Sequence, residues 1–240
     1  MFPIIQPDWP APKNVHGFTT TRMGGVSQSP YDTFNLGIHV NDNPDDVIKN
    51  RAILREQLPS EPFWLSQQHT TIALELAPFA EPPRADASYT REPNKVCAVM
   101  TADCLPILVC DKKGTIVSAI HAGWRGLATG ILPLTLDALE IPAEETLVWL
   151  GPAIGPTAFE LREDVRHAFL SNHMADETHF KVFEDRFLGD MVAMARWQCA
   201  KRGITNVYGG GLCTVSDPER FFSFRRDGET GRMATLIWIA

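Results

Sequence analysis

Four short apolar runs in the middle of the chain restrict the fold more than any other feature. They cover residues 96–100, 105–110, 115–120 and 146–150, and β-branched side chains are frequent in them. Short apolar runs bounded by polar residues or glycine are typical of buried strands. We therefore expect a sheet at the centre of the protein, with the polar residues between the runs at strand ends.

Helical patterns lie on either side of these runs. Asn43 and Pro44 offer an N-cap and a first-turn proline for a helix in which apolar residues recur up to Leu58. A second helix is expected after Gly126, with Pro133 in its first turns. The other expected elements are strands at 15–21, 63–65 and 71–76, helices at 161–170 and 186–202, a left-handed cap at Gly203 and a C-terminal hairpin of 221–225 and 233–239. This mixture of strands and helices predicts an α/β protein.

The charge balance argues against whole classes of partner. The 240 residues include 22 Lys and Arg against 29 Asp and Glu, a formal net charge of −7, and no block of basic residues. Proteins that bind nucleic acid or anionic membrane surfaces concentrate positive charge, so we expect neither partner. No run approaches the roughly 18 apolar residues that a membrane-spanning helix needs.

Length and cysteine content point to one cytoplasmic domain. The chain is long enough to bury a large core, and no linker or low-complexity segment divides it, so a single domain over 1–240 is expected. The first eight residues carry prolines and an acid where a secretory signal has a basic and then an apolar segment. The five cysteines, an odd number, are expected to stay reduced, as they do in the cytoplasm.

Three residues of metal-ligating types stand beside the breaks between strands. His69 lies between two expected strands, Cys104 lies between two of the apolar runs, and His121 directly follows the run 115–120. Their spacing lacks the close pairs, such as Cys-x-x-Cys, of structural zinc sites. Three dispersed ligands fit a catalytic zinc instead, which keeps a fourth position for a water whose pKa falls to about 7.

Taken one at a time, these residues also have ordinary interpretations. A cysteine beside a buried strand is commonly a small core residue, and a single histidine is commonly structural. The context favours a site, because Asp103 places a charge beside Cys104 and because Gly123 and Gly126 allow the backbone to approach a ligand closely. Of the other histidines, we expect His39 to be structural and four to lie at the surface: His16, His167, His173 and His179.

Longer sequence words carry a resemblance to a known family. Ala-Asp-Cys-Leu-Pro at 102–106 and His-Ala-Gly-Trp-Arg-Gly at 121–126 are too long for chance to be a good explanation. Further words, in the family's order, are Thr-Thr-Arg-Met-Gly-Gly-Val-Ser at 20–27, Phe-Asn-Leu-Gly at 34–37, Asn-Arg at 50–51, Ala-Asp-Ala at 85–87, Leu-Gly-Pro-Ala-Ile-Gly at 150–155, Phe-Ser-Phe-Arg-Arg-Asp at 222–227 and Thr-Gly-Arg at 230–232. Together they resemble the YfiH (laccase-domain, PgeF) family from about residue 15 to the end.

This resemblance implies a fold, a metal site and an activity. The fold is an α/β mixed-sheet layered sandwich related to cysteine-dependent toxin deamidases, and the zinc ligands fall on His69, Cys104 and His121. The activity is that of a purine nucleoside phosphorylase, which splits adenosine, inosine, guanosine or methylthioadenosine with phosphate and also deaminates adenosine.

Two words depart from the family pattern. Gln-Gln-His-Thr at 67–70 stands where the family usually has Gln-Val-His-Gly, and Glu-Leu-Arg at 160–162 stands where it has Glu-Val-Gly. The first departure keeps the histidine but is expected to reshape the mouth of the pocket. The second loses a glycine and adds a cation.

The two reactions need further groups. Asp103 and Glu160 are the candidates for proton transfer during deamination. Arg22 and Arg125 are the candidates for binding phosphate, because a guanidinium matches two phosphate oxygens, and Asn35 is the candidate for holding a sugar hydroxyl. Each arginine could instead form an ordinary ion pair.

Three other functions stay open from the sequence. Cys104 as nucleophile with His121 as base would make a metal-independent hydrolase or amidase, which fits the peptidoglycan precursor editing that the PgeF label implies. A copper-dependent polyphenol oxidase fits the laccase label, but seven histidines without a His-x-His pair are few for several coppers; one copper could still occupy the three-ligand site. A sensor that binds zinc or a nucleoside without turnover is the third.

Overall fold

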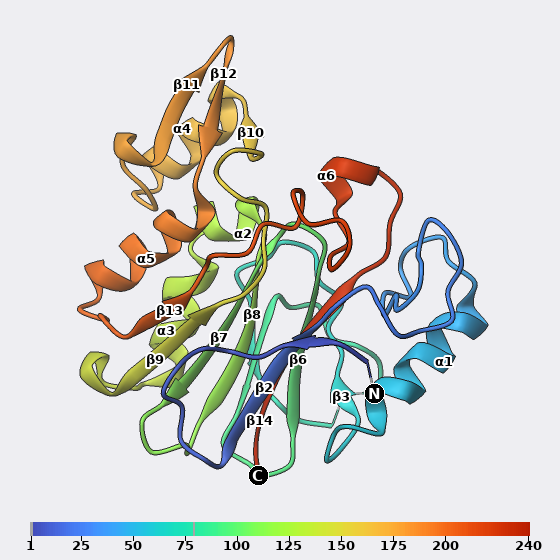
Figure 1. Ribbon diagram of the computed structural model, residues 1–240. Coiled ribbons are helices and arrows are strands. Elements are labelled where there is room, and N and C mark those ends of the chain that lie inside the picture. Colours follow the sequence, from blue (N-terminus) through green and yellow to red (C-terminus); the bar gives the residue numbers. More distant parts are fainter. Residues whose placement is uncertain (1, 79) are drawn as a thin grey trace.

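Two mixed β-sheets stacked face to face form the centre of the molecule (Figure 1). The structure is a computed structural model and describes residues 2–78 and 80–240. The five-stranded sheet has the order β1 (Ile4–Ile5), β2 (Val15–Thr20), β14 (Met233–Ile239), β6 (Val96–Thr101) and β3 (Pro62–Phe63). The six-stranded sheet has the order β13 (Val207–Gly209), β9 (Thr146–Leu150), β7 (Leu105–Asp111), β8 (Val117–Ala122), β5 (Ala87–Thr90) and β4 (Ala73–Glu75).

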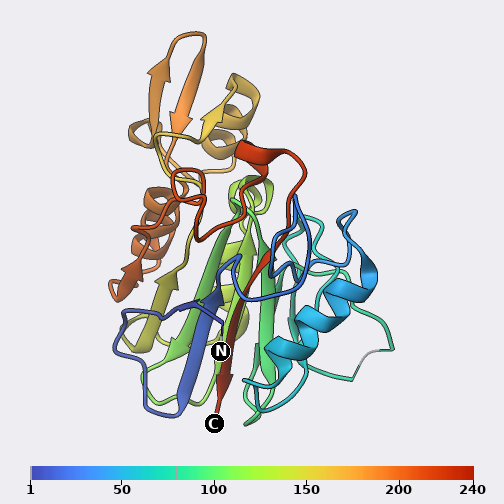
Figure 2. The ribbon, with the colours of Figure 1, turned by 45° about the vertical axis from the view of Figure 1, so that its right-hand side comes forward.

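Side chains that alternate along the strands build the layers. In β7, Leu108 and Cys110 pack between the two sheets, whereas Leu105 and Ile107 face the opposite side, where helices cover the six-stranded sheet. The covering helices are α2 (Trp124–Thr129), α3 (Ile131–Leu139) and α5 (Met191–Lys201), and α1 (Pro44–Arg55) packs on the outer face of the other sheet (Figures 1 and 2). A mixed α/β layered sandwich is therefore confirmed.

A smaller antiparallel sheet projects from one end of the sandwich (Figure 2). Its strands, in order, are β10 (Glu160–Leu161), β12 (Arg186–Gly189) and β11 (Phe180–Phe183), and α4 (Glu163–Ser171) lies beside them. Two short 3₁₀ turns, η1 (Ala143–Glu145) and η2 (Glu177–His179), and the one-turn helix α6 (Phe224–Asp227) complete the described elements.

The chain crosses between the two main sheets at the end that carries the candidate site. β6 ends at Thr101 in one sheet and β7 begins at Leu105 in the other, so residues 102–104 bridge them. The antiparallel partner of β7, β8, ends at this same edge, and its His121 lies opposite Pro106. The topology thus brings Cys104 and His121 to one edge.

Most elements expected from the sequence are present. α1 begins at Pro44 with Asn43 as its N-cap, β9 has the expected bounds, and Gly203 has the positive φ of a left-handed cap. The expected strand at 115–120 is shifted to Val117–Ala122, so His121 lies inside the strand rather than after it. The helix after Gly126 is divided into α2 and α3, because Gly130 takes a φ of +96°.

The single helix expected over 186–202 is wrong. Residues Arg186–Gly189 form strand β12, and the helix begins only at Met191, with the Asp190 side chain accepting the backbone N–H of Ala193. β12 pairs with β10 and β11, two strands that the sequence reading did not predict. Strand pairing, which includes a hairpin with the preceding strand β11, overrode a local helical pattern.

The C-terminal hairpin is also wrong. Phe224–Asp227 is a helical turn capped by Ser223, and Met233–Ile239 pairs with β2 and β6 in the middle of the five-stranded sheet. Most of this last strand is buried, which fits a central strand rather than the exposed arm of a hairpin.

The helices offer no candidate for a membrane span. Within residues 2–78 and 80–240, none is both long enough and apolar enough to cross a bilayer.

We predict that Asn50→Ala lowers the free energy of unfolding by roughly 2–3 kcal/mol, because it leaves buried polar groups unpaired. The fully buried Asn50 amide accepts the N–H of Val26 and donates to the carbonyls of Thr33 and Asn35, which ties the loop 26–35 to α1. Urea denaturation measures the loss. Lys49→Ala, on the exposed face of the same helix, is the control and should change little; equal stability of the two variants would contradict this role.

Candidate metal centre

Two histidines and a cysteine from three separate segments meet at the crossing between the sheets. His69 comes from the loop between β3 and β4, Cys104 from the crossing segment and His121 from β8. One side-chain nitrogen or sulfur from each lies within 4.8 Å of the others. Cys104 Sγ is 3.7 Å from His69 Nε2, and the two imidazole rings lie 4.9 Å apart at 71°. The structure therefore brings together the three residues that the sequence singled out.

The fully buried carboxylate of Asp86 orients both histidines. Its Oδ1 lies 2.8 Å from His121 Nδ1 and accepts the backbone N–H of His69, and its Oδ2 accepts hydrogen bonds from Gln68 and Thr70. An ionised carboxylate only accepts, so His121 Nδ1 carries a proton, and Nε2 is the ring nitrogen at which a metal ion would replace a proton. This is the outer support that metal-binding histidines usually have.

Electrostatics favour an ionised sulfur in this cluster. Burial raises the pKa of the Cys104 thiol, but the charge of His121 and hydrogen bonds from both histidines outweigh it and hold that pKa at about 6. Burial lowers the pKa of His121, but Cys104 and Asp86 together raise it to about 9. Burial also raises the pKa of Asp86, and the bonds from His121 and Thr70 bring it down to about 2. A thiolate is the form in which cysteine binds a metal.

Two residues of the site have left-handed backbone conformations. His69 has a φ of +57° and Asp103 a φ of +86°, a region that costs side-chain-bearing residues on the order of 1–2 kcal/mol. The backbone N–H of His69 donates to Asp86, and this bond holds the His69 conformation. Asp103 is held by Thr214 Oγ1 and by the N–H of Arg225, each 2.6 Å from a carboxylate oxygen. These hydrogen bonds compensate the cost of the two conformations, which occur at His69 and next to Cys104.

Gly123 is small because the cluster lies directly against it. A methyl group on its Cα would lie 2.6 Å from His69 Nε2 and 3.0 Å from Cys104 Sγ. The close backbone approach expected at this glycine is therefore seen, and it is made to the two candidate ligands themselves.

A cavity of about 570 Å³ lies between α2, β10 and the C-terminal loop. Two predicted site residues line this cavity: Arg125, the candidate for binding phosphate, and Glu160, a candidate for proton transfer. Arg125 is exposed and stacks over Trp124 at 4.4 Å, while Glu160 Oε2 accepts a hydrogen bond from Arg186 and its Oε1 has no partner among the described residues. The cavity adjoins the cluster through Trp124, the residue after Gly123.

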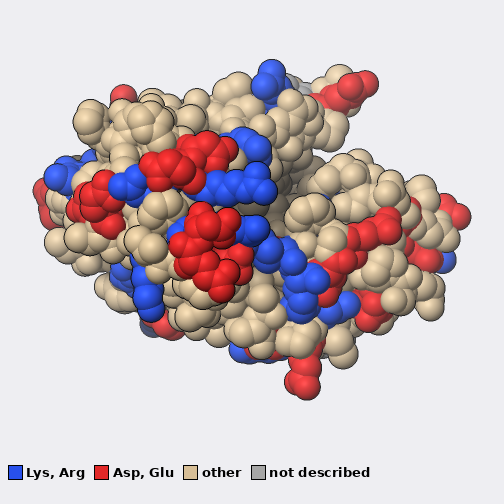
Figure 3. All heavy atoms as spheres, turned by 90° about the horizontal axis from the view of Figure 1, so that it is seen from above, with Lys and Arg blue, Asp and Glu red and all other residues tan. Residues whose placement is uncertain are grey.

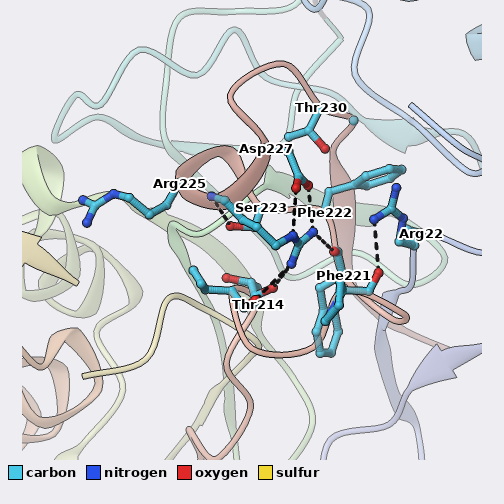
Figure 4. Close-up of polar contacts among 12 residues, drawn as sticks. Arg22, Thr214, Phe221, Phe222, Ser223, Arg225, Asp227 and Thr230 are labelled. Atoms are coloured by element: carbon cyan, nitrogen blue, oxygen red, sulfur yellow. Dashed lines mark hydrogen bonds and ion pairs between the residues drawn. The ribbon is translucent and has the colours of Figure 1, made fainter. Parts of the chain in front are cut away.

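Arg22, Asn35 and Asp103 make internal bonds instead of lining that cavity. Arg22 donates to the carbonyls of Asp32 and Pro218 and stacks on Phe222 (Figure 4). The fully buried Asn35 amide accepts the N–H groups of Gly37 and Arg232. Both carboxylate oxygens of Asp103 are bonded as described above. These contacts engage polar groups of all three residues within the chain, and their predicted roles toward substrate stay predictions.

Side-chain bonds to backbone carbonyls hold the C-terminal loop in place. Arg226 donates to the carbonyls of Thr214 and Phe221, and Ser223 caps the turn that carries Arg225 (Figure 4). The Arg225 guanidinium reaches away from this cluster to the carbonyls of Ala158 and Glu160. The loop thereby connects the site to the projecting sheet.

The sequence reading assigned no task to Asp86. Its signal was an acid between two alanines at the start of a strand, where a charge without a partner is costly. Among the other histidines, His16, His167 and His173 are exposed as expected and His179 is half-buried. His39 as a whole residue is exposed. The pKa of its imidazole is lowered first by burial of the ring and then by the charges of Arg232, Arg51 and His121.

Known proteins are similar to this chain over nearly its whole length. A family model described as multi-copper polyphenol oxidoreductase laccase matches residues 15–240. A Pseudomonas aeruginosa protein named purine nucleoside phosphorylase is 50% identical over 237 residues, or 98% of each chain. The Escherichia coli K12 protein named purine nucleoside phosphorylase YfiH is 49% identical over 243 residues, or 100% of each chain.

Solved structures share the fold. A Neisseria meningitidis protein of the DUF152 family superposes with a TM-score of 0.94 at 48% identity, covering 98% of each chain. YlmD from Geobacillus stearothermophilus gives a TM-score of 0.90 at 29% identity, covering 98% of this chain and 96% of its own.

Fold and site together define a layered α/β protein with a three-residue His–Cys–His cluster at a crossing between sheets. Within that class, the chain belongs to the YfiH family, whose family model carries the laccase description.

We predict that Gly123→Ala lowers the affinity for zinc by at least about 10-fold while the protein stays folded, because the added methyl displaces the His69 ring. Competition with a chromophoric chelator measures the dissociation constant. Gly211→Ala is the matched control, since nothing lies within 4 Å of its methyl position. Unchanged zinc affinity in Gly123→Ala would place the metal elsewhere.

Proposed function

We propose that this chain is a zinc-dependent purine nucleoside phosphorylase. It would split adenosine, inosine, guanosine or methylthioadenosine with phosphate into the free base and a sugar 1-phosphate, and deaminate adenosine. The names of the close relatives support the phosphorolysis. The convergence of two imidazoles and one thiol carries the proposal for the metal.

The donor set fits zinc in type, and the distance between Cys104 and His69 fits it in spacing. In a tetrahedral site, Zn–S and Zn–N bonds of about 2.3 and 2.0 Å put sulfur and nitrogen about 3.5 Å apart. Cys104 Sγ and His69 Nε2 are 3.7 Å apart. His69, Cys104 and His121 would hold the ion, leaving a fourth position open, and the ion would supply Lewis-acid chemistry there.

The chain's own residues would do the rest of the work. Asp86 fixes the ring of His121 and the backbone of His69, which keeps the metal-binding atoms in place before substrate arrives. The adjoining cavity would hold the nucleoside, with Arg125 as a substrate-binding group. Glu160 would move the proton in deamination through its unpaired Oε1, because both oxygens of Asp103 are already engaged.

A second candidate uses the same residues without a metal. The order Asp86–His121–Cys104 matches an orienting acid, a base and a thiol whose pKa is near 6, as in a cysteine hydrolase or amidase. This reading would fit a kinship with toxin deamidases and a task in peptidoglycan precursor editing. Copper-dependent polyphenol oxidation has less support, because three ligands offer room for a single copper only.

The setting proposed for this activity is the cytoplasm. All five cysteines are free thiols, as expected where thiols are kept reduced.

Incubation of purified protein with adenosine tests the proposal directly. With phosphate we expect adenine and ribose 1-phosphate, and without phosphate we expect inosine. Where phosphate is present and adenosine is first deaminated, the inosine is split in turn and hypoxanthine appears. Chromatography separates these products. Prior treatment with a strong chelator should abolish both activities, and added zinc should restore them. Activity that survives the chelator and is lost with a thiol alkylator would favour the cysteine hydrolase.

Cys104→Ala should lose both activities and most bound zinc while remaining folded, because two ligands hold zinc poorly. Cys213→Ala, at the other partly exposed cysteine, is the control and should keep them. No product from the unaltered protein in either condition would reject the proposed function.

A further inference from the structure

Two arginines near the metal centre are largely buried without an acidic partner. In the part of the chain that the structure describes, Arg51 and Arg232 form no ion pair with a carboxylate. Burial lowers the pKa of both guanidiniums, that of Arg51 to about 10. Both stay charged at neutral pH, and a buried charge is costly unless an opposite charge compensates it.

The two arginines flank one loop. Arg51 Nε donates to the carbonyl of Leu36 at 3.0 Å, and the N–H of Arg232 donates to Asn35 Oδ1 at 2.9 Å. Gly37 has no side chain because Arg232 lies against it: a methyl there would meet Arg232 Cγ at 2.8 Å. Loop 35–37 therefore holds both cations on a scaffold tied to α1 by Asn50.

This pair lies beside the candidate metal centre. Arg232 directly precedes Met233, which pairs with Thr101 at the end of β6, three residues before Cys104. Arg51 Nη2 reaches Met100 Sδ in the same strand. Burial, and after it the charges of Arg232, Arg51 and His121, lower the pKa of His39 in the neighbouring loop.

The nearby acids are used elsewhere. Glu61, whose charge acts on Arg51, accepts a hydrogen bond from Trp64, and Arg51 itself stacks on the Trp64 ring at 4.0 Å. After burial, the charges that act on Arg232 are those of Cys104, Asp103 and Tyr31. Cys104 belongs to the candidate metal cluster, Asp103 is bonded to Thr214 and the Arg225 backbone, and Tyr31 donates to Glu229. Arg232 Nη1 donates to carbonyls only, and its Nη2 has no acceptor among the described residues.

The molecular surface at this end is hollowed. Figure 3 looks onto the end where the projecting sheet and the C-terminal loop lie, and it shows a depression near the middle with Lys and Arg side chains along it. Lys and Arg side chains at such a hollow can attract a small anion, although Asp and Glu side chains lie beside them in the same view.

We infer that Arg51 and Arg232 form the seat of the phosphate that the proposed phosphorolysis consumes. This inference rests on the proposed function for the identity of the anion. Guanidinium forks suit a tetrahedral dianion because each can bond two of its oxygens.

The seat defines the geometry of the reaction. An oxygen of hydrogen phosphate forms a bond to C1′ of the nucleoside while the bond from C1′ to the purine nitrogen breaks. The electron pair of the broken bond leaves with the purine, which takes up the proton that the hydrogen phosphate carried.

Steady-state kinetics and direct binding test this seat. In Arg51→Lys and Arg232→Lys, and in the corresponding Met variants, the KM for phosphate should rise about 10- to 100-fold, the loss of one charge-assisted bond or more. The KM for the nucleoside should change less than about 3-fold. Arg55→Lys, one turn along α1, is the matched control, and circular dichroism checks that each variant folds.

Calorimetric titration of inorganic phosphate, without nucleoside, separates this seat from the proposed function. Lost phosphate binding in both variants supports the seat even if the unaltered protein turns over no nucleoside. Unchanged phosphate KM and binding, in variants that are folded and active, would overturn the seat while the proposed function stands. Two further results would also overturn the seat. One is phosphate binding that is lost in an Arg125 variant and kept in the Arg51 and Arg232 variants. The other is that the Arg51 and Arg232 variants lose binding of adenosine 5′-monophosphate but still bind inorganic phosphate.

Discussion

The buried carboxylate of Asp86 is the interaction on which the site depends. A charge removed from water is tolerated only when hydrogen bonds satisfy it, and here they come from residues 68–70 and from His121. The same bonds hold the left-handed backbone of His69 and select the His121 tautomer. Asp86 therefore couples the loop between β3 and β4, which carries His69, to strand β8, which carries His121. These bonds fix where the two imidazoles lie relative to each other.

The sequence identified the reactive residues better than the residues that position them. His69, Cys104 and His121 could be selected because metal-ligating side chains stood at strand breaks. Arg22 and Asn35 were selected by type and motif alone, and the structure engages both in internal bonds. The place of Asp86 in the cluster and the burial of Arg232 escaped notice, because burial and long-range bonds define them and a linear pattern carries no record of either.

The fold was predictable where local signals agree with the final packing. α1 has a cap, a proline and a helical period, and β9 is an uninterrupted apolar run, so both were placed well. The helix expected over 186–202 failed in its first part because residues 186–189 pair with β10 and β11. The strand Met233–Ile239 was predicted with its correct bounds, but the hairpin failed because this strand pairs with β2 and β6, more than a hundred residues away in sequence. Strand pairing decides such segments, and local propensity does not record it.

Zinc K-edge X-ray absorption on protein purified without chelator tests the central claim most directly. The account predicts one zinc per chain with a single sulfur at about 2.3 Å and nitrogen or oxygen neighbours at about 2.0 Å, the sulfur disappearing when Cys104 is replaced. A zinc shell without sulfur would contradict it. So would a protein that is fully active and holds no metal.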